Sequence, residues 1–368
     1  MKILICFGTR PEAIKMAMLC KEFDKRQITY KLCVTAQHRE MLDQVLGFFQ
    51  LKPDYDLDLM QPDQSLNVLG SKILKEIDAI LEREHWDLVL VHGDTLTSTM
   101  VALAAFYRQV KVGHVEAGLR TYTKKAPFPE EINRQLTGRI ADFHFAPTKA
   151  AQENLLNEGV AKNNVLVTGN TVVDALNWTL ENLKNTPNFP GLPALQKQLN
   201  PSKKLILITG HRRENFGEGL RDICSAVLQI AKKPNVEIVF ALHMNPNAKD
   251  KIVEMLENQV NIQLINAVTY PVFVWLMNRA SVIISDSGGI QEEAPSLQVP
   301  VVVTRNTTER QEGVDKGYTY LVGTDIEKIV GTVNQLLETS KEGRDFKNPY
   351  GDGTASEKIA AFIANLSL

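Results

Sequence analysis

The stretch Ser285–Pro295 has the sequence SDSGGIQEEAP and follows a short apolar run, Val282–Ile284. The apolar run predicts a buried parallel strand, and the residues from Ile290 onward predict the first turn of a helix. Gly288 and Gly289 lie between them and let the backbone turn tightly and approach a ligand, because neither carries a Cβ. A strand, a glycine turn and a helix N-terminus favour an anion-binding site. A tight turn with exposed acids explains the stretch equally well.

Two polar side chains of this stretch add detail to the anion-site hypothesis. Ser287 offers a hydroxyl beside the glycines, and Glu293 is far enough along the helix to reach past a phosphate to a sugar hydroxyl. The hypothesis is therefore a nucleotide-binding site.

Short β-rich runs alternate with longer amphipathic runs along the whole chain. This alternation is typical of parallel, doubly wound α/β sheets. Strands are predicted at Ile3–Phe7, Tyr30–Thr35, Leu88–His92, Val110–Val115, Phe143–Ala146, Val165–Val167, Leu205–Thr209, Glu237–Leu242, Ile262–Ile265, Val282–Ser285 and Val301–Thr304. The proline-rich stretch Asn182–Lys203 interrupts the pattern and predicts a boundary region between two similar halves.

Length and composition exclude several classes of protein. A chain of 368 residues favours two domains. A formal charge of −2 without blocks of like charge argues against nucleic acid as a partner. The four cysteines lie far apart with no CxxC pair, which is typical of a reduced protein. No apolar run is long enough for a membrane span and no signal sequence is recognisable, so no membrane partner and a cytoplasmic location are expected.

Ligands of open α/β sheets gather at the carboxyl ends of the strands, and the first predicted strand is followed by Gly8–Lys15. Thr9 and Glu12 fit a capping box at a helix start. Arg10 and Lys15 place two cations there, suited to a phosphate or a leaving group. A solvated lysine on a helix surface is the simpler interpretation of Lys15 alone. The motif GxGxxG is absent, so no dinucleotide fingerprint is present.

Three later strand ends or loops each supply a carboxylate. Asp94 follows VHG, Glu116 lies in GHVEAGLR, and Glu130 lies in PFPEEINR. Crowded carboxylates raise one another's pKa, which suits general acid–base chemistry. A turn or cap role explains each acid singly, but all three together favour a site. His92 and His114 are more typical of hydrogen-bonded structural residues, and no motif predicts a metal site.

The second half repeats this arrangement. GHRRENFG follows a predicted strand and brings His211 and Arg212 to its end, and His243 follows the next strand in HMNPN. The three consecutive donors His211, Arg212 and Arg213 suit a pyrophosphate or a base-bearing ligand. Arg310, in TTERQE, is a further phosphate ligand if it shares the site of Gly288. A surface ion pair is the alternative for Arg310.

The ordered motifs resemble one known family over residues 1 to about 353. They are FGTRPEAIKM, TAQHREMLDQV, VHGDT, GHVEAGLR, PEEINR, TGNTVVDAL, TGHRREN, HMNPN, SDSGGIQEEAPS, TTER and NPYGDG. The chain resembles the bacterial non-hydrolysing UDP-N-acetylglucosamine 2-epimerases. The resemblance implies a GT-B fold, with Rossmann-like domains 1–169 and 170–353 facing a cleft and the C-terminal helix, 354–368, packing back on the first.

The resemblance also implies a reaction and its partners. UDP-GlcNAc and UDP-ManNAc interconvert by elimination of UDP to a 2-acetamidoglucal and re-addition, supplying sugars for bacterial surface polysaccharides. No cofactor and no metal is needed. A homodimer and activation by substrate at a second site are implied as well. A hydrolysing epimerase, a GT-B glycosyltransferase and a catalytically silent nucleotide-sugar sensor are the alternatives. The carboxylate set argues against the sensor. The lack of an appended kinase segment and of a membrane-docking face argues against the other two.

Site residues follow from the resemblance, position by position. The implied catalytic groups are Asp94, Glu116, Glu130 and His211. The implied substrate-binding residues are Arg10, Lys15, Phe273, Ser287, Gly288, Gly289, Glu293 and Arg310. The implied second-site residues are Gln37, Glu40, Arg212 and His243. Which carboxylate removes the proton and which returns it stays open.

Overall fold

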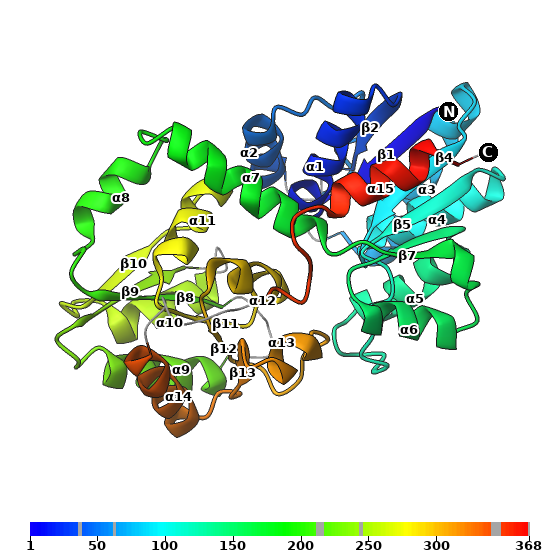
Figure 1. Ribbon diagram of the computed structural model, residues 1–368. Coiled ribbons are helices and arrows are strands. Elements are labelled where there is room, and N and C mark those ends of the chain that lie inside the picture. The colour runs from blue at the N-terminus through cyan, green and yellow to red at the C-terminus, as the bar shows by residue number, and fades with distance from the viewer. Residues whose placement is uncertain (36–38, 62–63, 211–216, 243–245, 340–346, 367–368) are drawn as a thin grey trace. The chain divides into compact units, whose positions relative to one another are not determined.

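The computed structural model of the protein describes residues 1–35, 39–61, 64–210, 217–242, 246–339 and 347–366 (Figure 1). The chain divides into two compact units. Unit 1 comprises Met1–Ala175 and Tyr350–Leu368, and unit 2 comprises Leu176–Pro349. The division falls inside helix α7 (Thr171–Asn185), so this helix belongs to both units.

Unit 1 is built on a parallel sheet in the order β3-β2-β1-β4-β5-β6-β7. Its strands are β1 (Ile3–Phe7), β2 (Tyr30–Val34), β3 (Tyr55–Asp56), β4 (Leu88–His92), β5 (Lys111–Val115), β6 (Phe143–Ala146) and β7 (Val165–Val167). Its helices are α1 (Arg10–Arg26), α2 (Arg39–Phe49), α3 (Leu66–Arg83), α4 (Leu96–Tyr107), α5 (Glu130–Ile140), α6 (Lys149–Asn157), a short 3₁₀ turn at Lys162–Asn164, and α15 (Ala355–Ala364). The strand order reverses between β1 and β4, which is where open α/β sheets bind ligands.

Unit 2 repeats the plan with the order β10-β9-β8-β11-β12-β13. Its strands are β8 (Lys204–Thr209), β9 (Val236–Ala241), β10 (Ile262–Ile265), β11 (Val282–Ser285), β12 (Val301–Val303) and β13 (Thr319–Leu321). Its helices are α8 (Leu192–Gln198), α9 (Glu218–Ile230), α10 (Pro246–Leu256), α11 (Tyr270–Arg279), α12 (Gly288–Glu293), a 3₁₀ turn at Ala294–Leu297, α13 (Gln311–Asp315) and α14 (Ile326–Glu338). Here the order reverses between β8 and β11.

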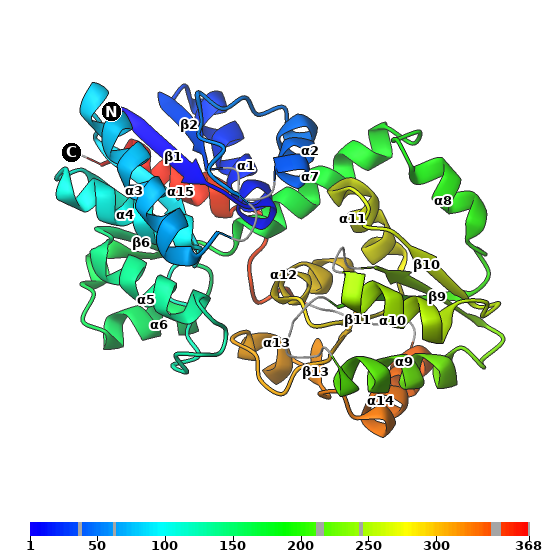
Figure 2. The same ribbon diagram turned by 180° about the vertical axis from the view of Figure 1, so that it is seen from behind.

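The apolar runs form strands because their side chains are buried in the cores of the two units. β1, β11 and β12 are buried along their whole length, because helices cover both faces of a parallel sheet. In unit 2, α9 and α14 pack side by side against the sheet (Figure 2) and share one apolar core with β8, β9 and β11. The predicted class of two Rossmann-like α/β domains is therefore confirmed.

The local structure corrects one prediction and adds elements that the sequence pattern did not predict. The glycine pair was expected in a turn before a helix starting at Ile290, but α12 already begins at Gly288. The boundary stretch contains a helix, α8, whose first turn accommodates Pro193 without losing a hydrogen bond. The sequence pattern also missed β3 and β13, which are two and three residues long.

The C-terminal segment returns to unit 1, where α15 packs on α1 (Figure 1). The buried Asp174 carboxylate of α7 accepts hydrogen bonds from the Ala355 and Ser356 N–H groups at the start of α15, at 3.3 and 2.7 Å. The carboxylate thus supplies acceptors for two N–H groups at the helix start that have no partner within the helix. Within the described ranges, no helix is both long and apolar enough to cross a membrane.

Candidate active site

The predicted capping box forms at the start of α1 and also joins two strand ends. The Thr9 side chain accepts from the Glu12 N–H, and Glu12 Oε2 accepts from the N–H groups of Gly8 and Thr9 at 3.0 and 2.8 Å. Glu12 Oε1 accepts from the hydroxyls of Thr95 and Ser98 at 2.7 and 3.2 Å. Burial raises the pKa of the Glu12 carboxyl, and these hydrogen bonds oppose the rise. Glu12 thus fixes the loops after β1 and β4 against each other.

Lys15 and Glu116 form a buried ion pair just beyond this junction. Lys15 is 6% exposed and Glu116 is 9% exposed, and Lys15 Nζ donates to Glu116 Oε2. The surface interpretation of Lys15 is therefore wrong. Glu116 also holds a left-handed backbone, with φ of 61°. A non-glycine residue in this conformation costs about 1–3 kcal/mol, and such strain concentrates at functional sites.

One neutral histidine lies beside the pair, and a second lies on β5, the strand that leads to Glu116. His92 Nε2 lies 3.8 Å from Glu116 Oε2, and burial lowers the pKa of His92 to about 4. His114 Nε2 is hydrogen-bonded to the Gly93 carbonyl at 2.7 Å, and burial lowers the pKa of His114 to about 3. Both imidazoles are therefore neutral near pH 7, so of Lys15 and His92 it is Lys15 that carries a positive charge beside Glu116.

Asp94 has a cationic partner of its own. Arg134, on α5, donates through Nη2 to Asp94 Oδ2, and its Nη1 lies 3.6 Å from Glu131 Oε2. The Asn133 amide donates to the Asp94 carbonyl oxygen at 3.0 Å. The Arg134 side chain is 4% exposed and that of Asp94 is 28% exposed. Asp94 is therefore held from one side and remains accessible.

Glu130 is the first residue of α5 and is half-buried. It precedes Arg134 by one helical turn, so the helix that holds Asp94 also carries Glu130. Arg10 begins α1 at the switch point and is half-buried. The candidates Arg10, Asp94 and Glu116 thus follow neighbouring strands of one sheet, and Glu130 lies on the helix that holds Asp94.

In unit 2 the predicted phosphate ligand Arg310 sits in a buried charge network. Its Nε and Nη2 lie 2.7 and 2.6 Å from Glu292 Oε1, and its Nη1 donates to Glu309 Oε1. Arg305 Nη1 lies 3.2 Å from Glu309 Oε2. All four side chains are less than a tenth exposed. The network holds the Arg310 guanidinium in place, because moving it would leave buried carboxylates uncompensated.

The two glycines of α12 play different parts. A Cβ on Gly288 would lie 2.5 Å from the Arg310 Cζ, which is a severe overlap. A Cβ on Gly289 would meet Glu293 Oε2 at 3.9 Å, an ordinary contact. The expectation that Gly288 leaves room for a ligand therefore changes: the space beside it holds the guanidinium of Arg310.

The other predicted nucleotide residues flank α12. Tyr270 Oη donates to Glu293 Oε1 at 2.8 Å, and both residues are buried. Burial and the neighbouring Glu293 carboxylate raise the pKa of Tyr270 well above its usual value, so the phenol keeps its proton and donates. Phe273, on α11, and Ser287, before α12, are half-buried. Glu293 thus has a fixed orientation before any ligand arrives.

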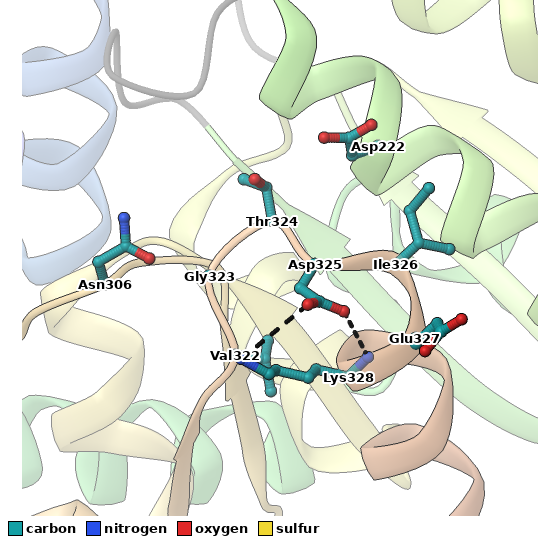
Figure 3. A pocket seen from close by; sticks show the side chains of 9 residues that line it. All are labelled: Asp222, Asn306, Val322, Gly323, Thr324, Asp325, Ile326, Glu327 and Lys328. Carbon is teal, nitrogen blue, oxygen red and sulfur yellow. Dashed lines mark hydrogen bonds and ion pairs between the residues drawn. The ribbon is translucent and has the colours of Figure 1, made fainter.

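A separate hollow of about 510 Å³ lies between β13 and α14 (Figure 3). Asp222, Asp325 and Glu327 line it with one cation, Lys328, which is 3.9 Å from Asp325. Its acidic lining does not suit a diphosphate. Among the described residues, no group of three or more His, Cys, Asp or Glu side chains could hold a metal ion.

Comparison with known proteins decides the family. The sequence pattern of the family described as UDP-N-acetylglucosamine 2-epimerase matches residues 21–364. The chain is 50% identical over 371 residues to UDP-N-acetylglucosamine 2-epimerase of Yersinia pestis, covering 99% of each. The chain belongs to the UDP-N-acetylglucosamine 2-epimerase family. The predicted membership of the UDP-N-acetylglucosamine 2-epimerases is thus confirmed.

Solved structures of this epimerase family agree with the fold. The Neisseria meningitidis UDP-GlcNAc 2-epimerase bound to UDP-GlcNAc superposes with a TM-score of 0.95 at 47% identity, over all of both chains. The Methanocaldococcus jannaschii enzyme in complex with UDP-GlcNAc and UDP gives a TM-score of 0.86 at 35% identity, over 99% of both. These likenesses confirm the GT-B fold class.

Part of the predicted epimerase site lies outside the described residues. This holds for the catalytic candidate His211 and for Gln37, Arg212 and His243 of the second site. Glu40, the remaining second-site candidate, is exposed in the first turn of α2. The role of every candidate residue therefore stays a prediction.

Some contacts of the candidate site were not predicted from the sequence. Arg134 lies in the quoted motif PEEINR, and its spacing from Glu130 and Glu131 places charges on one helix face, which was an available signal. Asn170, whose Nδ2 donates to Glu116 Oε2 at 2.6 Å, comes from TGNTVVDAL and gives no signal of charge or period. Tyr270 begins an apolar helix and gives no such signal either.

Proposed function

We propose that the protein interconverts UDP-N-acetylglucosamine and UDP-N-acetylmannosamine as a non-hydrolysing 2-epimerase, an isomerase. The observation that carries the proposal is the buried ion pair between Lys15, on the helix that begins at the switch point of the first sheet, and Glu116, whose backbone is strained just after β5. The UDP-GlcNAc in the similar Neisseria meningitidis structure supports a UDP-sugar as substrate.

The proposed chemistry is an elimination followed by an addition. A carboxylate removes the proton from C2 of the sugar, the C2–H electron pair forms a C1=C2 double bond, and the C1–O bond breaks to release UDP. A carboxylic acid then returns a proton to the opposite face of C2, and the UDP oxygen re-forms the bond to C1. Asp94, Glu116 and Glu130 are the proposed acid and base groups, with His211 beside the leaving group. No oxidant or reductant is consumed.

The nucleotide half of the site is proposed to hold UDP through both steps. Arg310 supplies positive charge for the diphosphate, and the N–H groups at Gly288 and Gly289 supply donors. Glu293, oriented by Tyr270, accepts from the ribose hydroxyls. Phe273 packs near the uracil, and Arg10 and Lys15 assist the phosphates. Retention of UDP is what makes re-addition, and hence epimerisation without hydrolysis, feasible.

The test is incubation with UDP-GlcNAc in deuterated water, followed by NMR. Deuterium is expected at C2 of UDP-ManNAc, without stoichiometric free N-acetylmannosamine. Accumulation of the free sugar would instead favour a hydrolysing epimerase. Absence of C2 exchange would refute the proposed chemistry and leave a glycosyltransferase or a nucleotide-sugar sensor.

We further propose that the protein is a homodimer. Leu66 and Val68 at the start of α3, Phe106 and Tyr107 at the end of α4, and Leu136 on α5 are between 44% and 65% exposed. These three helices pack in sequence on one another, and an interface formed on this layer would bury these apolar side chains. Light scattering should give twice the mass of one chain, and a single-chain mass would contradict the dimer.

The cytoplasm is the proposed location, where the product would enter surface-polysaccharide synthesis. All four cysteines, Cys6, Cys20, Cys33 and Cys224, are buried free thiols, which suits a reducing compartment. Cell fractionation tests this location.

A further inference from the structure

Two sequence motifs with no part in the proposed chemistry meet in unit 1. The Asn170 N–H of TGNTVVDAL donates to the Tyr350 carbonyl of NPYGDG at 2.6 Å. Gly169 and Gly351 both have left-handed backbones, with φ of 90° and 127°. A Cβ on Gly169 would lie 3.1 Å from the Gly351 Cα and 3.2 Å from the Tyr350 oxygen. The returning C-terminal segment therefore packs directly on the backbone beside Asn170.

The side chain of Asn170 has a defined orientation. Its Oδ1 accepts from the Val172 N–H at 3.0 Å in the first turn of α7. A backbone N–H requires an acceptor, so the amide oxygen must face Val172 and the amide nitrogen must face away. That nitrogen donates to Glu116 Oε2 at 2.6 Å, and Asn170 is 2% exposed. The direction of this hydrogen bond is thus fixed by the start of α7.

Asn170 and Lys15 donate to the same oxygen of Glu116. The titratable groups that face Glu116 include Lys15 from α1 and His92 from β4. A lysine ammonium is a compact charge on a flexible stem and sets little direction. A buried amide held by its own backbone cap sets direction, and a donor to the charged form of a carboxylate stabilises that form.

We propose that Asn170 is a positioning residue, which holds the Glu116 carboxylate ionised and in a fixed orientation for its proton transfers. This inference rests on the acid–base role proposed for Glu116. It gives the TGN and NPYGDG motifs a shared purpose: Gly169, Gly351 and the Tyr350 carbonyl fix the backbone from which the amide reaches Glu116.

The test is Asn170→Asp. This change keeps the size and the acceptor for Val172 but replaces the amide donor with a second carboxylate beside Glu116. Two carboxylates that share one site retain a proton to higher pH. The acidic limb of the kcat/KM profile should therefore move up by about one pH unit or more, and kcat at pH 7 should fall about tenfold. UDP affinity should match that of the wild type. An unchanged pH profile would overturn the inference.

Two further variants distinguish failure of the positioning role of Asn170 from failure of the acid–base role of Glu116. Asn182→Asp, in the helix that follows Asn170, is the matched control, because the Asn182 amide donates to the Trp178 carbonyl at 2.9 Å, and its pH profile should not move. Glu116→Gln tests the proposed function itself, and retained turnover there would remove the acid–base role whatever Asn170→Asp does. A collapse in Glu116→Gln with a wild-type profile in Asn170→Asp would refute the positioning role alone. If Asn170→Asp does not fold, Asn170→Ser keeps a cap acceptor without the second carboxylate, and wild-type kcat in that variant would refute the inference.

Discussion

Replacing Glu116 by Gln should lower the rate of epimerisation by about 10²- to 10⁴-fold, the usual contribution of a general acid or base. Glutamine keeps the shape of the side chain but neither accepts nor returns a proton at neutral pH. Asp94→Asn should act in the same way. UDP affinity, measured by calorimetry, should largely survive in both variants, because the proposed UDP ligands Arg310 and Glu293 belong to unit 2.

The Glu116 variant also leaves the buried Lys15 ammonium without its carboxylate. Removing one partner of a buried pair destabilises by about 3–5 kcal/mol, so lost activity needs a control for lost structure. Glu158→Gln provides it. Glu158 pairs with the buried Arg120 through two hydrogen bonds of 2.8 Å and has no proposed part in the chemistry. Glu158→Gln should lose stability and keep its turnover per folded molecule. Unchanged turnover in Glu116→Gln would return Glu116 to a structural role.

Much of the fold followed from sequence because both sheets are parallel. Strands covered on both faces become continuous apolar runs, and β1, β4, β6, β7, β10 and β11 have the predicted bounds. Ligand groups of such sheets follow the strand ends, which is why Arg10, Asp94 and Glu116 were identifiable. The capping box of Thr9 and Glu12 was identifiable too, because it is a local pattern.

The site contacts that the sequence did not predict join residues far apart along the chain. Asn170 and Glu116 are 54 positions apart, and no local pattern joins them. The left-handed backbone of Glu116 is invisible in a sequence where glycine is the usual signal for that conformation. The pairing of Arg134 with Asp94 spans 40 positions in the same way. Such pairings are set by the order of strands in the folded sheet.

Gly288 and Gly289 were predicted to serve one purpose, and the structure separates them. Gly288→Ala should destabilise the ligand-free protein by about 1–3 kcal/mol, the usual cost of overpacking a buried site. The added methyl would overlap the Arg310 guanidinium, which cannot move away cheaply because Glu292 and Glu309 hold it. Since Arg310 is the proposed diphosphate ligand, UDP affinity should fall at least about tenfold, or about 1.4 kcal/mol.

Gly289→Ala is the neighbouring control, and its effects should differ in kind. Its Cβ would meet Glu293 Oε2 at an ordinary 3.9 Å, and alanine in a helix is favoured over glycine by up to about 1 kcal/mol. Urea unfolding should therefore show unchanged or higher stability. If Gly289 lies against the diphosphate as proposed, UDP affinity should nevertheless fall, because the methyl would stand where the phosphate approaches the backbone. Wild-type stability and UDP affinity in Gly288→Ala would show that Arg310 is not fixed by this glycine. Full UDP affinity in Gly289→Ala would remove Gly289 from the phosphate site and leave Arg310 as the proposed diphosphate ligand beside α12.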